Sequence, residues 1–173
     1  MQPVAECSVT ARPGHRIVEV YDADAYLGDE QALEASRHHV VAGNGYHLYL
    51  HTLQPHIHVH ITIRLWDSTP PAPAADAEGH TPVAPDSETG TLVISQLTLG
   101  PVGEMTLPHP GVYEGTAWWT GRQAASDYYA QILQRIDDEW TPEAITQAWA
   151  ACPTPERYVL DLAHTGPSAS EDD

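Results

Sequence analysis

Two runs of alternating residues decide the fold of this chain: Tyr46-His47-Leu48-Tyr49-Leu50-His51 and His56-Ile57-His58-Val59-His60-Ile61-Thr62-Ile63-Arg64-Leu65-Trp66. Apolar side chains recur at every second position, which is the period of a β-strand, whose successive side chains point to opposite faces. In the longer run one face is aliphatic, and the other carries histidine, threonine, arginine and tryptophan. The pattern predicts two strands, each with one apolar face turned toward a core.

The segment 52–55 that separates the two runs is short enough for a β-hairpin. Pairing residues whose numbers sum to about 107 places Leu48 opposite Val59, and His47 opposite His60. This register keeps apolar side chains opposite apolar ones and imidazoles opposite imidazoles. We therefore expect a hairpin with its aliphatic face buried and its imidazole face in water.

The rest of the chain extends the β pattern. Further strands are predicted at 16–21, 91–97, 104–107, 112–120 and 157–162, with glycines between them. Helical spacing occurs at 29–38, 124–136 and 142–151. The fold class that follows is mainly β: an antiparallel β-sandwich with a helical insert, residues 122–151, before the last strand.

The predicted boundaries enclose one β-sandwich domain over residues 1–164. Within it, residues 67–90 are rich in proline and acids, show no apolar period, and are predicted to form a long loop. Residues 165–173 contain glycine, proline, serine and three terminal acids, a composition typical of a disordered acidic tail.

The chain is strongly acidic. Its 173 residues carry 24 acidic and 7 basic side chains, for a net charge of −17. This charge argues against binding to nucleic acid or to an anionic membrane surface. The sequence lacks a signal-peptide pattern and any apolar run long enough to cross a membrane, so we expect a cytoplasmic protein in which Cys7 and Cys152 stay reduced. All seven basic residues are arginine, and the absence of lysine is typical of a protein from a GC-rich genome. Such a compositional bias is an alternative, non-functional origin for part of the acidity.

Histidines give the first candidate site. In the predicted hairpin His58 and His60 point the same way, with His47 opposite them, so the three imidazoles are candidate ligands for zinc. The alternative is an exposed imidazole face that binds no metal. Apart from zinc, no cofactor is predicted. The sequence has no nucleophile elbow, phosphate loop or CxxC motif, which favours a protein that is not an enzyme.

A cluster of acids between the two late helical segments gives the second candidate site. Asp137, Asp138, Glu139 and Glu143 surround Trp140. A tryptophan can anchor a protein partner while the carboxylates steer it, so these five residues are a candidate partner-binding edge. The alternative is a solvated helix junction, since acids are favourable near the helix start expected at Thr141.

Several segments, taken in order, resemble a known family. They are the opening strand 15–21, Gly43-Asn44-Gly45-Tyr46-His47-Leu48, the strand 59–67, Gly90-Thr91-Leu92-Val93-Ile94, the stretch 105–118 with Gly111-Val112-Tyr113, and the closing strand 156–162. This order is similar to that of the bacterial competence protein J family, the inhibitors of DNA-entry nucleases. The resemblance spans residues 15–164, although the helical segment 124–151 is longer than in the shortest members. It implies a β-sandwich that holds a nuclease inactive by binding, with no catalytic residues to carry over.

The resulting functional prediction is a non-enzymatic acidic protein that inhibits or neutralises a basic partner, such as a nuclease or a toxin. Two alternatives remain from the sequence. One is a zinc-binding β-protein or zinc enzyme that uses His47, His58 and His60. The other is an accessory protein that binds a small hydrophobic ligand inside the sandwich.

Overall fold

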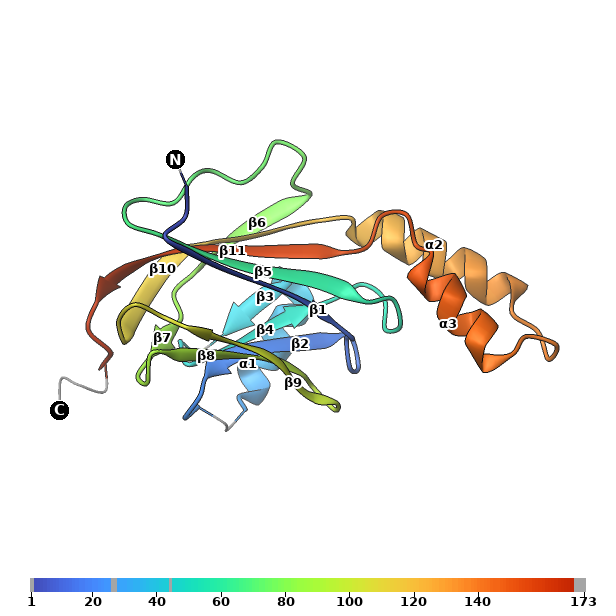
Figure 1. Ribbon diagram of the computed structural model, residues 1–173, viewed down its shortest axis with the longest axis horizontal. Coiled ribbons are helices and arrows are strands. Elements are labelled where there is room, and N and C mark those ends of the chain that lie inside the picture. The colour runs from blue at the N-terminus through green and yellow to red at the C-terminus, as the bar shows by residue number, and fades with distance from the viewer. Residues whose placement is uncertain (1, 26–27, 44, 170–173) are drawn as a thin grey trace.

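A computed structural model of the chain describes residues 2–25, 28–43 and 45–169. Its strands form two sheets that face each other, and a pair of helices projects from one end (Figure 1). The fold is therefore mainly β and sandwich-like, as the sequence predicts.

The first sheet has the strand order β1-β5-β11-β10-β6, and β7 pairs with β10 beside this path. Its strands are β1 (Ala5–Ala11), β5 (Val59–Trp66), β6 (Gly79–Val83), β7 (Asp86–Ser87), β10 (Gly111–Thr120) and β11 (Arg157–Gly166). The pairing is antiparallel except between β5 and β11, which run parallel. The sheet is therefore mixed, and the prediction of antiparallel pairing throughout is wrong for the pair β5–β11.

The second sheet has the strand order β3-β4-β2-β8-β9 and is antiparallel in the described residues. Its strands are β2 (Ile17–Asp22), β3 (Val41–Gly43), β4 (His47–His51), β8 (Thr91–Gln96) and β9 (Gly100–Thr106). Helix α1 (Glu30–His39) packs on this sheet, where Ala32 and Leu33 contact Ile17 and Tyr49. Asp29 caps the helix by accepting hydrogen bonds from the amides of Gln31 and Ala32.

Aliphatic side chains from both sheets fill the space between them. Val18, Val20, Leu48 and Leu50 come from the second sheet; Ile61, Ile63, Leu65, Leu160 and Leu162 come from the first. These side chains are at most 3% exposed. The alternation in the sequence therefore identifies the core face correctly, and the interior is occupied by the protein's own side chains.

The predicted hairpin between the two alternating runs is wrong. Strand β4 pairs with β2 and β3, whereas β5 pairs with β1 and β11 in the other sheet. The segment 52–58 crosses from one layer to the other instead of turning back on itself. Both runs keep their aliphatic side chains inward, but from opposite sides of the core, so the imidazoles end up on the two outer faces.

A buried polar network holds this crossover. The amide group of Gln54 donates to the carbonyl of Ile57 at 2.8 Å and to Glu156 Oε2 at 2.8 Å. The amide of Leu53 and the hydroxyl of Tyr158 donate to Glu156 Oε1, at 2.8 and 2.6 Å. Gln54 and Glu156 are both fully buried. A buried polar side chain needs such partners, so these bonds select the crossover in place of a hairpin turn.

Two other boundaries differ from the predictions. Strands β6 and β7 lie inside the segment 67–90, because the backbone of β10 has a free edge on which residues 79–83 pair. Strand β11 continues to Gly166, and the amide of Ala169 donates to Asp86 Oδ2 at 2.9 Å, so residues 165–169 are not a free tail. Residues 170–173 of the predicted tail lie outside the described residues.

On the outer face of the first sheet, a carboxylate joins three strands. Asp161 accepts two hydrogen bonds from the guanidinium of Arg64, at 2.7 and 2.9 Å. The indole nitrogens of Trp66 and Trp118 donate to the same carboxylate at 3.0 and 2.8 Å. Burial alone would raise the pKa of Asp161, but the bonds from Arg64 and the two indoles outweigh it and lower the pKa. The charged carboxylate is thereby fully satisfied.

The helical insert forms an arm made of α2 (Arg122–Arg135) and α3 (Pro142–Ala150), which extends beyond the end of the sandwich (Figure 1). The hydroxyl of Tyr128 on α2 donates to the carbonyl of Ala148 on α3 at 2.6 Å and holds the two helices together. None of the helices in the described ranges has the length and apolar character needed to cross a membrane.

Replacing Glu156 by glutamine tests the crossover network. In Glu156→Gln one acceptor oxygen becomes an NH₂ group that faces donors from Leu53 or Gln54. We expect the free energy of unfolding to fall by about 1–3 kcal/mol, the usual effect of leaving a buried donor unsatisfied. Urea unfolding measures this. Glu114→Gln, an exposed position on β10, is the control and should change the stability by less than about 0.5 kcal/mol. Equal stabilities of the two variants would contradict the network's role.

The pH dependence of stability gives a second test of the same carboxyl. Burial raises the pKa of Glu156, although the bonds from Tyr158, Leu53 and Gln54 and the charge of Arg122 oppose the shift. Between its ordinary and its raised pKa, the folded chain holds a proton that the unfolded chain has lost. The contribution of Glu156 to stability is therefore full below its ordinary pKa and declines as the pH rises through the raised value. Urea unfolding from pH 4 to pH 7 should show this decline in the wild type and lack it in Glu156→Gln.

Candidate functional site

The tip of the arm carries the predicted acidic cluster. Asp137, Asp138, Glu139 and Glu143 are exposed, and none of them takes part in an ion pair among the described residues. Asp137 Oδ1 accepts the amide of Glu139 at 2.9 Å, which bends the chain between the helices. The structure thus presents three carboxylates on the short, solvated connection between the helices and a fourth, that of Glu143, in the first turn of α3.

Trp140 lies within this cluster and is partly buried. Its amide donates to the carbonyl of Asp137 at 3.2 Å, and Thr141 caps α3 by accepting the amide of Ala144 at 3.1 Å. The five predicted partner-binding residues therefore sit together at the helix connection. Glu143 in the first turn of α3 also interacts favourably with the helix dipole.

A second group of acids, which follows β2, has structural roles instead. Asp22 is buried and accepts hydrogen bonds from the hydroxyls of Ser87 and Thr89, at 2.6 and 2.7 Å. Asp29 caps α1, and Glu34 pairs with Arg37 at 3.2 Å. The acids at the arm tip differ because their charges are available to another molecule.

An aromatic stack joins the arm to the sandwich. The imidazole of His56 stacks on the rings of Tyr129 and Trp149, with centroids 5.6 and 5.8 Å apart. His56 Nδ1 and the hydroxyl oxygen of Tyr129 lie 3.0 Å apart. Partial burial, followed by the positive charge of Arg12, lowers the pKa of His56. The titratable ring of His56 therefore packs against both α2 and α3 and links the arm to the sandwich.

The predicted zinc site is not formed. His47 is buried on the outer face of the second sheet, stacked between Tyr21 and Tyr49 at 4.8 and 4.6 Å. His58 and His60 are exposed on the first sheet. Because the chain crosses between layers at 52–58, the three imidazoles cannot meet. Over the described ranges, no group of three or more His, Cys, Asp or Glu side chains has the geometry to hold a metal ion.

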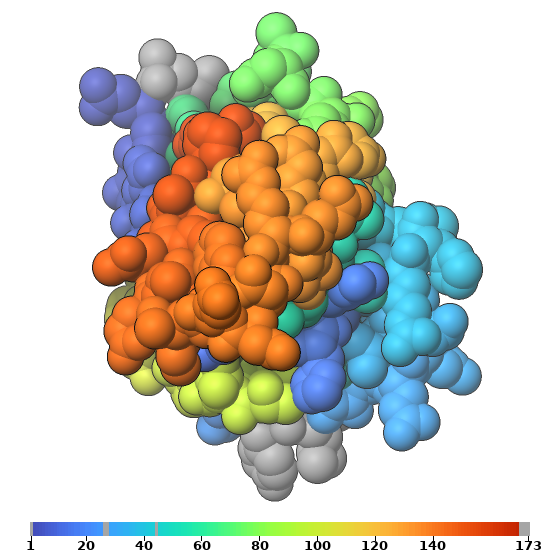
Figure 2. Space-filling view, turned by 90° about the vertical axis from the view of Figure 1, so that its right-hand side faces the viewer, coloured from blue at the N-terminus to red at the C-terminus, as the bar shows by residue number. Residues whose placement is uncertain are grey.

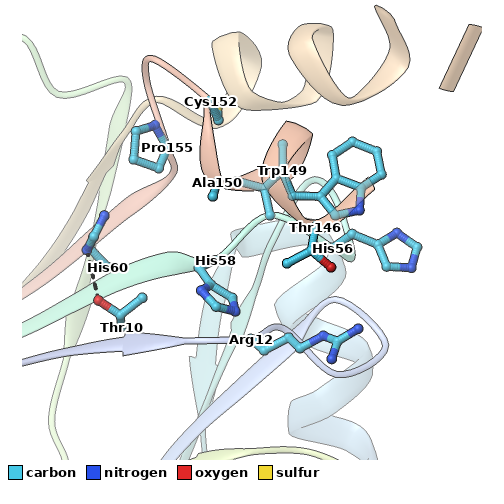
Figure 3. A pocket seen from close by; sticks show the side chains of 11 residues that line it. Thr10, Arg12, His56, His58, His60, Thr146, Trp149, Ala150, Cys152 and Pro155 are labelled. Carbon is cyan, nitrogen blue, oxygen red and sulfur yellow. Dashed lines mark hydrogen bonds between the residues drawn. The ribbon is translucent and has the colours of Figure 1, made fainter. Parts of the chain in front are cut away.

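His58 and His60 instead line a cleft of about 320 Å³ at the base of the arm (Figure 3). Strands β1 and β5 and the residues next to them provide Thr10, Arg12, His56, His58 and His60; the end of α3 and the residues after it provide Thr146, Trp149, Ala150, Cys152 and Pro155. Figure 2 views this end of the molecule, where the arm covers much of the surface. His60 Nδ1 and Thr10 Oγ1 lie 3.3 Å apart.

The sequence pattern did not predict that Arg12, Tyr129 or Trp149 belongs to a site. Arg12 follows β1, a strand whose pattern was not recognised. Tyr129 and Trp149 fit the apolar spacing of their helices and thus resembled ordinary core residues.

Comparison with known proteins shows two solved structures with this fold. ComJ from Bacillus subtilis, an inhibitor of the DNA-degrading activity of NucA, aligns over 95% of this chain and 98% of its own, with a TM-score of 0.59 and 12% identity. The protein of crocagin biosynthetic gene J aligns over 94% of this chain and 100% of its own, with a TM-score of 0.55 and 16% identity. No family model and no curated protein matches the sequence. The predicted resemblance to competence protein J is confirmed at the level of the fold.

Lowering the pH should loosen the arm. The pKa of His56 is lowered in the folded state, so the stabilisation it provides is present above the ordinary histidine pKa of about 6.5 and is lost as the pH falls below it. We expect hydrogen exchange of the α3 amides, corrected for intrinsic rates, to accelerate between pH 7.5 and pH 5.5. His56→Phe keeps a stacking ring but cannot titrate, and it should remove this acceleration. Amides of β10 are the internal control; the same pH response in His56→Phe would contradict the assignment.

Proposed function

We propose that this protein is a non-enzymatic binding protein that inhibits a basic enzyme, such as a nuclease, through the acidic tip of its arm. The observation that carries the proposal is the set of four unpaired carboxylates at the end of a helical arm that extends from the sandwich. A fold shared with an inhibitor of a DNA-degrading enzyme, over nearly the full length of both chains, supports the same role.

The electrostatics of the two partners are complementary in this proposal. An enzyme that grips DNA needs a cationic surface for the phosphate backbone. A chain of net charge −17 is attracted to such a surface, and its carboxylates replace the phosphates there. The projecting arm makes this contact sterically possible, because its tip lies away from the bulk of the sandwich (Figure 1). Trp140 among the carboxylates supplies an apolar anchor.

The alternatives raised by the sequence receive less support. A zinc site would need His47 to lie beside His58 and His60, but His47 belongs to the second sheet and the other two histidines lie on the first. A hydrophobic ligand between the sheets would have to displace fully buried core side chains such as Ile61 and Leu160. We expect the inhibitor to act in the cytoplasm, where Cys7 and Cys152, both free thiols, stay reduced.

Neutralising the tip tests the proposal. The quadruple variant Asp137→Asn, Asp138→Asn, Glu139→Gln, Glu143→Gln removes four charges without shortening any side chain. With a purified nuclease encoded beside the gene for this protein, we expect the association rate at low salt to fall by at least about tenfold, and inhibition of DNA degradation to weaken in parallel. Surface plasmon resonance and a DNA-degradation assay measure the two effects.

A matched control separates the tip from the total charge. The variant Asp67→Asn, Asp76→Asn, Glu104→Gln, Glu114→Gln removes four exposed charges from the sandwich. It should retain most of the binding and inhibition. Equal losses in both variants would show that only net charge matters, and no loss in the tip variant would exclude the tip as the binding surface.

A further inference from the structure

The cleft at the base of the arm has a charge opposite to that of the chain. Arg12, His56, His58 and His60 line it, and none of the carboxylates in the described ranges does. The adjoining hollow, of about 390 Å³, shares Thr10 and His60 with the cleft and adds Arg157. In a protein with 24 acidic and 7 basic side chains, a concave surface with two arginines, three histidines and no acid is not expected from composition.

The arginines of this surface are not neutralised within the protein. Arg37, Arg64 and Arg122 each form an ion pair with a carboxylate. In the described part of the chain, Arg12 and Arg157 take part in no ion pair; Arg157 instead lies 6.0 Å from the centroid of the Trp118 ring. Arg16 and Arg135 also form no ion pair among the described residues, so it is the position of Arg12 and Arg157 on one concave surface, which is lined by no acid of the described residues, that points to a ligand from outside the chain.

The sheet arranges these donors in rows. Thr10, His60 and Arg157 are neighbours across three strands, since His60 is in register with Thr10 of β1 and with Arg157 of β11. Figure 3 shows the side chain of Arg12 beside that of His58, with Trp149 on the opposite wall. His58 and His60 are two positions apart on one strand and therefore face the same side.

The chemistry of this lining suits an oxyanion and not a cation. A guanidinium presents a planar fork of N–H donors that matches a carboxylate or a phosphate, and an imidazole N–H adds a further donor. A metal ion would be repelled by Arg12, and the described residues hold no cluster of metal ligands here. The indole of Trp149 provides an aromatic wall against which the organic part of a ligand can pack.

We propose that this cleft binds a small organic oxyanion, a carboxylate or a phosphate, whose charged group contacts Arg12, His58 and His60 and whose apolar part packs on Trp149. The site is separate from the acidic tip of the arm and does not depend on the proposed inhibitory role. Binding here would cover no carboxylate of the cluster at positions 137–143.

Titration with simple anions tests the site. Isotope-labelled protein at low ionic strength is titrated with inorganic phosphate, acetate and benzoate, and the side-chain resonances of Arg12, His58 and His60 are followed by NMR. We expect saturable shifts, with benzoate binding more tightly than acetate because its ring contacts Trp149. Saturation with phosphate alone would assign the ligand as a phosphate, and saturation with the carboxylates alone would assign it as a carboxylate; either result supports an oxyanion site.

Two substitutions make the test specific. Arg12→Gln should weaken binding by about tenfold or more, the usual effect of losing a charge-assisted hydrogen bond. Arg135→Gln, the same change at an exposed position on α2 outside the cleft, should leave the affinity unchanged. The absence of saturable shifts up to about 50 mM anion, a far weaker affinity than a built site gives, would overturn the proposal. Equal weakening in both variants would also overturn it. Neither of these results would change what is expected of the tip variants, so the oxyanion site and the inhibitory role of the tip can be contradicted separately.

Discussion

The buried carboxylate of Glu156 determines where three parts of the chain meet. It accepts hydrogen bonds from the crossover at Leu53 and Gln54 and from Tyr158 on β11, and it lies 3.9 Å from the guanidinium of Arg122 at the start of the arm. Burying a carboxyl group is costly, and this one is tolerated because the crossover and β11 donate hydrogen bonds to it and the arm places the cation of Arg122 beside it. The same requirement forces the three segments to come together, which gives the sandwich its crossover and the arm its point of attachment.

The positions of the surface groups follow from this junction. Because the chain changes layer at 52–58, His47 lies on the outer face of the second sheet, between Tyr21 and Tyr49, while His58 and His60 lie on the first sheet beside the arm. Arg122 also donates to the carbonyl of His51, at 3.1 Å, and so links the end of β4 to the first turn of α2. His56 comes directly after the crossover and stacks on the arm. The cleft is therefore a consequence of how the crossover presents β5 to the helices.

The three helices and most of the strands were predictable from the sequence, whereas the strands β1, β3, β6 and β7 and the pairing of the strands were not. A period of two in 46–66 correctly indicates which side chains face the space between the two sheets, but it does not show that His47, Tyr49 and Trp66, on the other face, are buried as well. Pairing depends on residues far away in sequence: the strand partner of His60 is Arg157, and the buried partner of Gln54 is Glu156. In the sequence, Gln54 beside a proline resembles an ordinary turn residue. The acidic cluster at the arm tip was predictable because its members are sequence neighbours, whereas the cleft joins segments more than a hundred residues apart.

The two charged surfaces lie at opposite ends of one short helix, which determines how they influence each other. Helix α3 has nine residues and is about 13 Å long, with Glu143 in its first turn and Trp149 near its end. At physiological ionic strength, charges in water are screened over about 8 Å. The cationic cleft therefore does not neutralise the acidic tip, and a basic partner approaching the tip experiences its carboxylates nearly in full. Because His56 and Trp149 fix this helix against the sandwich, the same contacts that shape the cleft also determine where the tip points.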